Sequence, residues 1–321
     1  MKNIYLNIYK PNLINLNKAK KNIENNHVIG LPTETVYGLA ANAYSDKSVK
    51  KIFKLKRRPS FNPLIIHYKN LKNSKDDIIF NNDLIKLYKA FCPGPITFIV
   101  NKKQKSKISK FASFQKKTIA VRFPKHKDAR KLLKILNTPL AAPSANISSK
   151  LSPTSAYDVF DEFKNKIKFI LNGGRCKIGL ESTILDLTTQ PTILRQGVIL
   201  NKEIRKVLRK KVIIKKNVNK VKSPGQLRFH YYPGIPVTMN KHTAQKNGAF
   251  ITFGKKFISK KNNFNISQKG NLKEAANNLY KTMRIIKNKK FKSIAVCRIP
   301  NVGVGQAIND RLKKASNKWI I

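Results

Sequence analysis

Apolar and polar positions alternate along most of the chain with two different periods. Recurrence at helical spacing predicts helices at residues 17–26, 46–57, 82–91, 127–137, 154–165 and 201–209. Short apolar runs predict strands at residues 27–31, 63–68, 96–100, 119–123, 167–171, 183–187 and 192–195. Helices that alternate with strands in this way are typical of a layered α/β domain.

Candidate end signals accompany the first two helices. Asn17 is the candidate N-cap of the first helix, and Ser45 or Asp46 can cap the second. Pro59 is expected to end the second helix, because proline lacks a backbone N–H and its ring clashes with the preceding turn.

A polar stretch interrupts the alternation at residues 215–235. It contains Ser223-Pro224-Gly225 and Tyr232-Pro233-Gly234, which are typical of a linker. A second, smaller α/β unit follows, with strands predicted at 249–253 and 294–297 and helices at 271–287 and 304–316. We therefore expect a first domain at residues 1–214, a linker at 215–235 and a smaller domain at 236–321.

The charge balance is strongly basic. The 321 residues include 67 Lys and Arg against 15 Asp and Glu, a formal net charge of +52. A clustered excess of this size would indicate a nucleic-acid or other polyanionic partner. Here Lys is spread over nearly every segment, together with abundant Asn and Ile, which favours compositional drift as the main cause. Weak, non-specific RNA binding at low salt is still expected.

Cysteine usage and hydropathy point to an intracellular setting. Cys92, Cys176 and Cys297 are far apart and include no C-x-x-C pair, so neither a disulfide framework nor a zinc ribbon is expected. The N-terminal residues lack the apolar stretch of a secretory signal, and no apolar run approaches the roughly 18 residues of a membrane span. We expect the reducing cytoplasm and no membrane association.

Two short polar segments offer groups that suit a phosphate-bearing substrate. Lys56-Arg57-Arg58 is a dense cationic step, and Ser144-Ala145-Asn146 follows an apolar run. Fixed positive charge and short hydrogen-bonding side chains are what an enzyme acting on a polyphosphate needs. The cations also have a structural explanation, because a helix C-terminus favours them by about 0.3–1 kcal/mol. The rigid turn Pro59–Pro63 favours a site, since it would hold Arg58 and Asn62 on one side.

Four further features are considered for ligand contact. Pro32–Gly38 brings hydroxyls and a carboxylate to the end of a strand, although an ordinary strand-to-helix loop explains it equally well. Arg122 lies in an apolar strand and needs an anionic partner, which a ligand could supply because acids are scarce. His67 has the same place in its own strand, where a lone His is more often a core residue. Gly303-Val304-Gly305 is only half of a dinucleotide fingerprint, so a glycine-rich helix entry is favoured.

Taken in order, these segments resemble the YrdC-type catalytic domain of the threonylcarbamoyl-AMP synthase family, over about residues 15–210. The matching segments are Gly30–Leu39, Lys56–Arg58, Asn62–His67, Cys92–Pro95, Thr118–Pro124, Ser144–Asn146, Gly179–Thr183 and Leu194–Gly197. Ser223-Pro224-Gly225 with His230-Tyr231 resembles the linker of the long, two-domain form, although Phe229 stands where the family usually has Arg. The resemblance implies a YrdC-like twisted mixed sheet with flanking helices, followed by a smaller Rossmann-like α/β accessory domain.

The family reaction joins L-threonine, bicarbonate and ATP into threonylcarbamoyl-adenylate and pyrophosphate, for threonylcarbamoyladenosine modification of tRNA. Threonine carbamate is itself a nucleophile, so the protein needs only to align it with ATP and stabilise phosphate charge. The resemblance also implies Mg²⁺ held through the ATP phosphates, with no protein metal site. A downstream tRNA threonylcarbamoyl transferase is a candidate partner, and tRNA binding is expected to be weak or non-specific.

The resemblance and the residues together assign the site. Catalytic roles fall to Lys56, Arg58, Ser144 and Asn146, and we expect Lys56 and Arg58 at the surface of a cleft. The implied ATP contacts are Arg58, Asn62, Thr118, Ser144, Ser152, Arg195 and Tyr231, with the linker over the nucleotide. The implied threonine contacts are Thr35, His67, Arg122, Ser182 and the backbone at Ala142.

Two alternatives remain open. An RNA-binding module would carry exposed aromatics interleaved with Arg, whereas the distinctive positions here are Thr, Ser, Asn and His at strand ends. A carbamoyl-transferring relative with the same fold would normally be part of a much larger chain with zinc-finger cysteines, which this sequence lacks.

Overall fold

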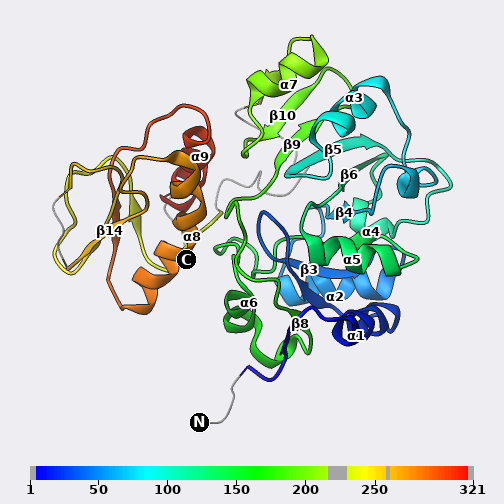
Figure 1. Cartoon of the computed structure of the whole chain (residues 1–321), viewed down its shortest axis with the longest axis horizontal. Coiled ribbons are helices and arrows are strands. Elements are labelled where there is room, and N and C mark those ends of the chain that lie inside the picture. Colours follow the sequence, from blue (N-terminus) through cyan, green and yellow to red (C-terminus); the bar gives the residue numbers. More distant parts are fainter. Residues whose placement is uncertain (1–4, 216–229, 258–260, 317–321) are drawn as a thin grey trace.

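The computed structural model describes residues 5–215, 230–257 and 261–316. A large first domain and a smaller C-terminal domain lie side by side, as Figure 1 shows. Most of the predicted linker, including Ser223–Gly225 and Phe229, lies outside the described residues. Its predicted position over the nucleotide therefore stays a prediction.

A mixed sheet of 11 strands forms the frame of the first domain, in the order β1-β8-β2-β3-β7-β4-β6-β5-β9-β10-β11. Its strands are β1 Ile8–Tyr9, β2 Ile29–Leu31, β3 Gly38–Asn42, β4 Ile65–His67, β5 Ile96–Asn101, β6 Thr118–Arg122, β7 Leu140–Ala141, β8 Ile170–Leu171, β9 Thr183–Asp186, β10 Thr192–Arg195 and β11 Ile213–Ile214.

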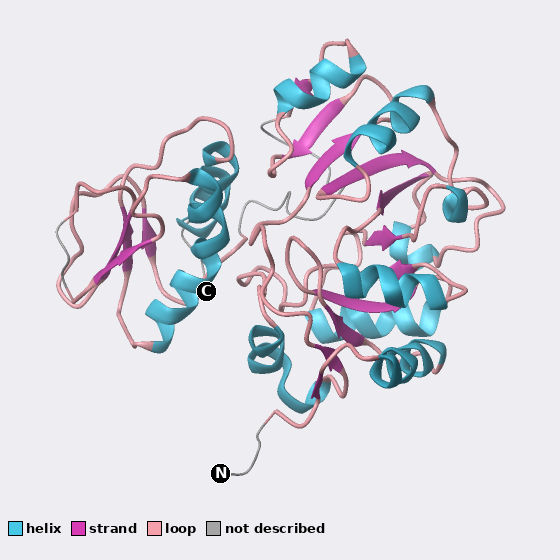
Figure 2. Cartoon of the chain, in the orientation of Figure 1, coloured by secondary structure: helices cyan, strands magenta, loops and turns pink. Residues whose placement is uncertain are grey.

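Helices flank this sheet, as Figure 2 shows. They are α1 Leu13–Glu24, α2 Asp46–Lys56, α3 Asn82–Phe91, α4 Lys110–Ser113, α5 Lys127–Ile135, α6 Ala156–Phe163 and α7 Asn201–Leu208, with 3₁₀ turns η1 Lys72–Ser74 and η2 Lys164–Lys166. Alternate residues of β3 face two different cores: Leu39 belongs to the core that contains α2, and Ala40 to the core that contains α1 and α5. A sheet buried on both faces explains the near-continuous apolar runs in the sequence.

The C-terminal domain has a four-stranded parallel sheet in the order β12-β15-β13-β14. Its elements are β12 Val237–Thr238, β13 Ala249–Thr252, β14 Asn263–Asn265, β15 Ile294–Val296, α8 Leu272–Asn288 and α9 Gly305–Ser316. Helix α9 begins at Gly305, so Gly303–Gly305 is the glycine-rich helix entry that the sequence favoured. In the described parts of the chain, no helix combines the length and apolar character needed to cross a membrane.

One local prediction was wrong, and one alternative that the sequence left open is excluded. Helix α1 begins at Leu13, with Asn12 as its N-cap, because the buried stripe of Leu16, Ala19 and Ile23 needs the earlier start; Asn17 lies inside the helix. The segment Thr33–Gly38 does not lead into a helix. It connects β2 to β3, which are interior strands of the sheet and pair antiparallel, so the turn lies at the ends of two buried strands.

Candidate active site

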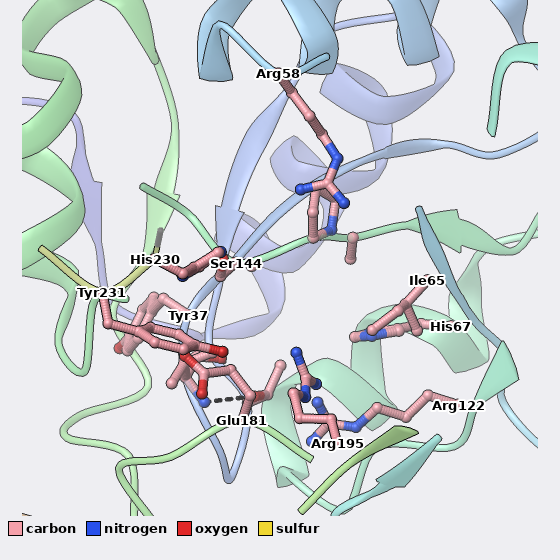
Figure 3. A pocket seen from close by; sticks show the side chains of 15 residues that line it. Tyr37, Arg58, Ile65, His67, Arg122, Ser144, Glu181, Arg195, His230 and Tyr231 are labelled. Carbon is pink, nitrogen blue, oxygen red and sulfur yellow. Dashed lines mark hydrogen bonds between the residues drawn. The ribbon is translucent and has the colours of Figure 1, made fainter. Parts of the chain in front are cut away.

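A small cavity of about 40 Å³ lies where the ends of several strands of the first domain meet His230 and Tyr231 (Figure 3). Its lining consists of Thr33, Val36, Tyr37, Gly38, Arg58, Ile65, His67, Arg122, Ala142, Pro143, Ser144, Glu181, Arg195, His230 and Tyr231. Ligand pockets usually measure about 300–1,000 Å³. A substrate of the size of ATP therefore requires the lining residues to move apart.

Arg58 reaches this cavity from the turn after α2. Arg57 caps the helix in the left-handed conformation, with φ 49°, and the chain then reverses. The Arg58 guanidinium donates from Nε to the carbonyl of Asn62 (2.9 Å), and from Nη2 to Asn62 Oδ1 (2.6 Å) and the carbonyl of Pro63 (2.9 Å). The turn thus fixes Arg58 beside Asn62, as predicted, and leaves little rotamer freedom to lose when a ligand binds.

Lys56 does not lie at the surface of a cleft, contrary to expectation. Its side chain is only 1% exposed, and Nζ donates to the carbonyls of Ser144 and Asn146, at 2.5 Å each. Burial, and to a smaller extent the charge of Arg58, lowers the pKa of Lys56 well below its usual value. The position at the buried face of α2 draws the ammonium inward, so Lys56 braces the Ser144–Asn146 loop rather than lining the cavity.

Arg122 and His67 stand next to each other because β4 and β6 are parallel neighbours in register. Arg122 Nη2 donates to Glu34 Oε1 at 2.8 Å, so the Thr33–Gly38 turn supplies the anionic partner that the sequence led us to seek in a ligand. Burial on its own raises the pKa of Glu34, but the charge and hydrogen bond of Arg122 outweigh it and leave that pKa lowered. Burial and Arg122 lower the pKa of His67, which favours its neutral form.

Arg195, at the end of β10, is fixed by the residues before β9. Its Nε donates to the carbonyl of Ser182 (3.0 Å) and its Nη2 to the Ser182 hydroxyl (3.1 Å), which also lies 2.7 Å from Thr97 Oγ1. The neighbouring Glu181 is buried and accepts a hydrogen bond from Ser152 at 2.5 Å. Although burial by itself raises the pKa of Glu181, Arg311 and Arg195 lower it to about 2.

Several buried polar atoms at this cavity have no hydrogen-bond partner in the described structure. They are both ring nitrogens of His67, Nε of Arg122, Nδ1 of His230 and the hydroxyl of Tyr231. Buried polar groups are nearly always paired, and each unpaired one costs about 1–3 kcal/mol. Several such atoms around one cavity, facing an excess of guanidinium groups, indicate a site for an anionic, hydrogen-bonding ligand.

Comparisons with known proteins identify the family. The sequence profile of a family described as "Telomere recombination" matches residues 21–197, and one described as "Threonylcarbamoyl-AMP synthase, C-terminal domain" matches residues 199–317. The threonylcarbamoyl-AMP synthases of Pyrococcus abyssi and Bacillus subtilis are 35% and 33% identical to this chain. Both alignments cover 93% of the chain, and they cover 93% and 92% of the two relatives. The chain belongs to the threonylcarbamoyl-AMP synthase family.

The fold of this family extends over both domains. The crystal structure of P. abyssi Sua5 complexed with L-threonine superposes on the chain with a TM-score of 0.88, at 33% identity, and covers 96% of each chain. The fold class predicted from the sequence, a twisted mixed sheet with flanking helices and a second, smaller α/β domain, is confirmed.

The structure gathers half of the predicted synthase residues around the cavity. Those that line it are Arg58, His67, Arg122, Ala142, Ser144, Arg195 and Tyr231. Those that hydrogen-bond to a lining residue are Lys56, Asn62, Asn146, Ser152, Thr35 and Ser182. Thr118 lies at the other end of β6 from Arg122, about 13 Å away along an extended strand.

Sequence reasoning did not single out Glu181 and His230, which line the cavity, and it offered Thr33 and Tyr37 only as parts of a candidate turn. Each lies inside a segment that carried the family resemblance, so the segments were found and the inward-facing side chains were not. Glu181 gave no signal of its own, because its partners come from distant parts of the chain.

Proposed function

We propose that the chain condenses L-threonine, bicarbonate and ATP into threonylcarbamoyl-AMP and pyrophosphate, for the threonylcarbamoyl modification of tRNA. The observation that carries the proposal is the convergence of three guanidinium groups, those of Arg58, Arg122 and Arg195, on one cavity. Glu181 is the single carboxylate among the described residues that line it. Together with the names of the relatives, this charge balance favours a polyphosphate and an amino-acid carboxylate as ligands.

The chemistry does not require a protein nucleophile. The amine of threonine and bicarbonate form a carbamate with loss of water. A carbamate oxygen then attacks the α-phosphorus of ATP, and the bond from that phosphorus to the bridging oxygen breaks as pyrophosphate leaves. The protein must align the two reactants and stabilise the negative charge that develops on the phosphates.

For ATP, we propose that Arg58 and Arg195 contact the phosphates directly, together with the hydroxyls of Ser144 and Tyr231. Asn62 acts through its hydrogen bond to Arg58. The other proposed ATP contacts and supporting residues are Ser152, Thr118, Lys56 and Asn146. Because Thr118 stands at the far end of β6, its role requires the nucleotide to extend along that strand.

For threonine, we propose that Arg122 receives the carboxylate, since its Nε is buried and has no hydrogen-bond partner. His67 presents two similarly unpaired nitrogens at the same place and suits the polar groups of the amino acid. Thr35, Ser182 and the backbone at Ala142 complete the proposed threonine contacts. The Ala142 amide itself donates to the carbonyl of Ile65 at 2.9 Å, which leaves its carbonyl as the backbone group for the ligand.

We propose that Mg²⁺ enters with ATP and is held through the phosphate oxygens. Within residues 5–215, 230–257 and 261–316, no three His, Cys, Asp or Glu side chains are grouped so as to hold a metal ion. Mg²⁺ usually keeps several waters and binds through one or two carboxylates together with substrate phosphates. When bound, the cation would neutralise charge on the departing pyrophosphate.

The proposed setting of the reaction follows from its product. A reactive adenylate must be consumed by an acyl-transfer enzyme that acts on tRNA, so we propose a downstream tRNA threonylcarbamoyl transferase as the partner and the cytoplasm as the compartment. The net charge of +52 supports weak, non-specific contact with tRNA itself.

The test is to incubate the purified chain with ATP and Mg²⁺ and to omit threonine or bicarbonate in turn. We expect pyrophosphate and the adenylate only when all components are present. Serine should be a poor substitute, because one methyl group discriminates by about 1–3 kcal/mol. Pyrophosphate release at the full rate without threonine would contradict the proposal.

A further inference from the structure

A buried polar cluster connects the cavity to the C-terminal domain at Glu181. This carboxylate is 5% exposed and accepts hydrogen bonds from both domains. Ser152 of the first domain donates at 2.5 Å, the hydroxyl of Tyr280 in α8 lies 3.1 and 3.2 Å from the two oxygens, and Nε of Arg311 in α9 donates at 3.1 Å. The single acidic residue of the described lining is thus held mainly by the other domain.

Arg311 contacts three parts of the cavity wall at once. Besides Glu181, its Nη1 donates to the carbonyl of Gln196, the residue after Arg195, at 2.8 Å. Its guanidinium carbon lies 5.3 Å from the centre of the Tyr231 ring, within the range of a cation–π contact. Arg311 is 1% exposed, so these contacts are made away from water.

Adhesion between the domains does not by itself explain this cluster. Val36, Leu151 and Leu180 of the first domain already pack into the apolar core of the C-terminal domain. Replacing a buried ion pair by apolar side chains is often neutral or stabilising, because desolvation offsets the attraction. A buried Arg and Glu at an interface that has its own apolar contacts therefore suggest a task that apolar residues could not perform.

We propose that Arg311, assisted by Tyr280, is a positioning residue for the reaction, fixing Glu181 and the Tyr231 ring so that the cavity can align ATP with the carbamate. The C-terminal domain is then part of the active site through these two side chains. This inference rests on the proposed function, because the reaction supplies its kinetic test.

The chemical reason lies in the competition for Glu181. The two guanidinium groups whose charges act most strongly on this carboxylate are those of Arg311 and Arg195. While Arg311 and Tyr280 hold Glu181, the carboxylate stays on the side of the C-terminal domain. If Arg311 is removed, the Glu181 carboxylate is drawn toward Arg195 and offsets positive charge that the ATP phosphates require.

The experiment compares the full-length chain with Arg311→Met, Arg311→Lys and the control Asn277→Ala. Asn277 lies in the same interface and donates to the carbonyl of Cys176 at 2.7 Å, but it contacts neither Glu181 nor Tyr231 through any hydrogen bond. We expect Arg311→Met to lower kcat/KM by about 100-fold, a size typical of misplaced catalytic groups, with a raised KM for ATP. Arg311→Lys should recover part of this loss, and Asn277→Ala should stay within about twofold of the wild type.

Hydrogen exchange separates this inference from the proposed function. Amides of residues 179–183 and 230–232 should exchange faster in Arg311→Met than in the wild type and in Asn277→Ala, whether or not the wild type forms the adenylate. If the wild type releases no pyrophosphate, the proposed function fails and the exchange result alone decides whether Arg311 fixes these residues. If Arg311→Met and Asn277→Ala match in both kcat/KM and exchange, Arg311 is only an interface residue.

Discussion

At the scale of single residues, the most definite prediction about activity concerns Arg58. Three carbonyl or amide oxygens orient its guanidinium toward the cavity. We expect Arg58→Ala to reduce kcat/KM by an amount on the order of 3–4 kcal/mol, since one preorganised charge contact to a transition state is typically worth that much. Arg58→Lys should recover little, because an ammonium cannot reproduce the planar fork that Asn62 and Pro63 hold.

The matched control for Arg58 is its neighbour Arg57. The Arg57 side chain is exposed and belongs to the same cationic triplet, but it does not line the cavity. Arg57→Asn removes the charge and tolerates the left-handed backbone at φ 49°. We expect Arg57→Asn to release pyrophosphate at close to the wild-type rate in a steady-state assay. Far-UV circular dichroism checks that the variants are folded. Equal losses in both variants would mean that the triplet acts only through its bulk charge.

Glu181 gives a prediction about pH. Its pKa falls from an ordinary value of 4.5 to about 2 in the folded chain. Between these values the unfolded chain binds the proton and the folded chain does not, so stability falls as pH decreases through that window. The Glu181 contribution, on the order of 3 kcal/mol at neutral pH, should disappear near pH 2.

The measurement for Glu181 is urea unfolding of the wild type and Glu181→Gln, at about pH 6 and about pH 3. Other acids, Glu34 among them, titrate in both proteins and cancel in the difference. We expect the wild type to be the more stable protein at the higher pH, and the difference to shrink at the lower one. A difference that does not change with pH would show that the carboxylate titrates alike in both states.

Residue types in the sequence indicated which segments form the candidate site, but not which side-chain atoms face the ligand. Arg58 with Asn62 could be anticipated, because Pro59 and Pro63 restrict the turn that joins them. The direction of Lys56 could not be anticipated, since its place at the end of α2 is compatible with the cavity and with the interior. Only packing of the 144–146 loop against α2 decides between the two.

At the scale of elements, the N-cap of α1 is Asn12 in the structure, whereas the sequence predicted Asn17. Asn12 Oδ1 accepts from the amide of Asn15 at 2.8 Å, whereas Asn17 is exposed inside the helix. We expect Asn12→Ala to lower the free energy of unfolding by about 1 kcal/mol, the usual value of an N-cap. Asn17→Ala should be neutral or slightly stabilising, because Ala is the better helix former. Urea unfolding of the two variants is the measurement, and the reverse order would restore Asn17 as the cap.

Elements with several turns or a long apolar run were predictable, and most of the very short ones were not. The two-residue strand β8 does lie inside the predicted range 167–171, whereas β3, with five residues, was not expected. The ranges expected for α3, β5, β10 and α8 agree with the structure to within one residue at each end. The strands β1, β7, β11 and β12 have two residues each, too few to show a period. Such strands form because neighbours in the sheet present free backbone groups, a condition that no local pattern records.

For the molecule as a whole, the domain interface was the part that sequence could not supply. Glu181 precedes Tyr280 by 99 residues and Arg311 by 130. No motif in the sequence indicates that these three residues contact one another. The sequence predicted two units joined by a linker, but it gave no contact between them. The shared apolar core and the Glu181 cluster argue instead that the two domains function as one unit.

A truncated chain that ends at Lys215 tests whether the two domains function as one unit. Its two main cores lie entirely within the first domain, so we expect a folded α/β protein by far-UV circular dichroism, with a lower Tm than the full chain. Removal of α8 and α9 uncovers the side chains of Val36, Leu151 and Leu180 and leaves Glu181 without Tyr280 and Arg311. Adenylate formation should therefore fall, and ATP hydrolysis should rise relative to it, because water reaches a cavity that is no longer held closed. Chromatographic separation of AMP, ADP and the adenylate measures that ratio. A truncated chain that forms the adenylate at the full rate would show that the C-terminal domain is dispensable for the chemistry.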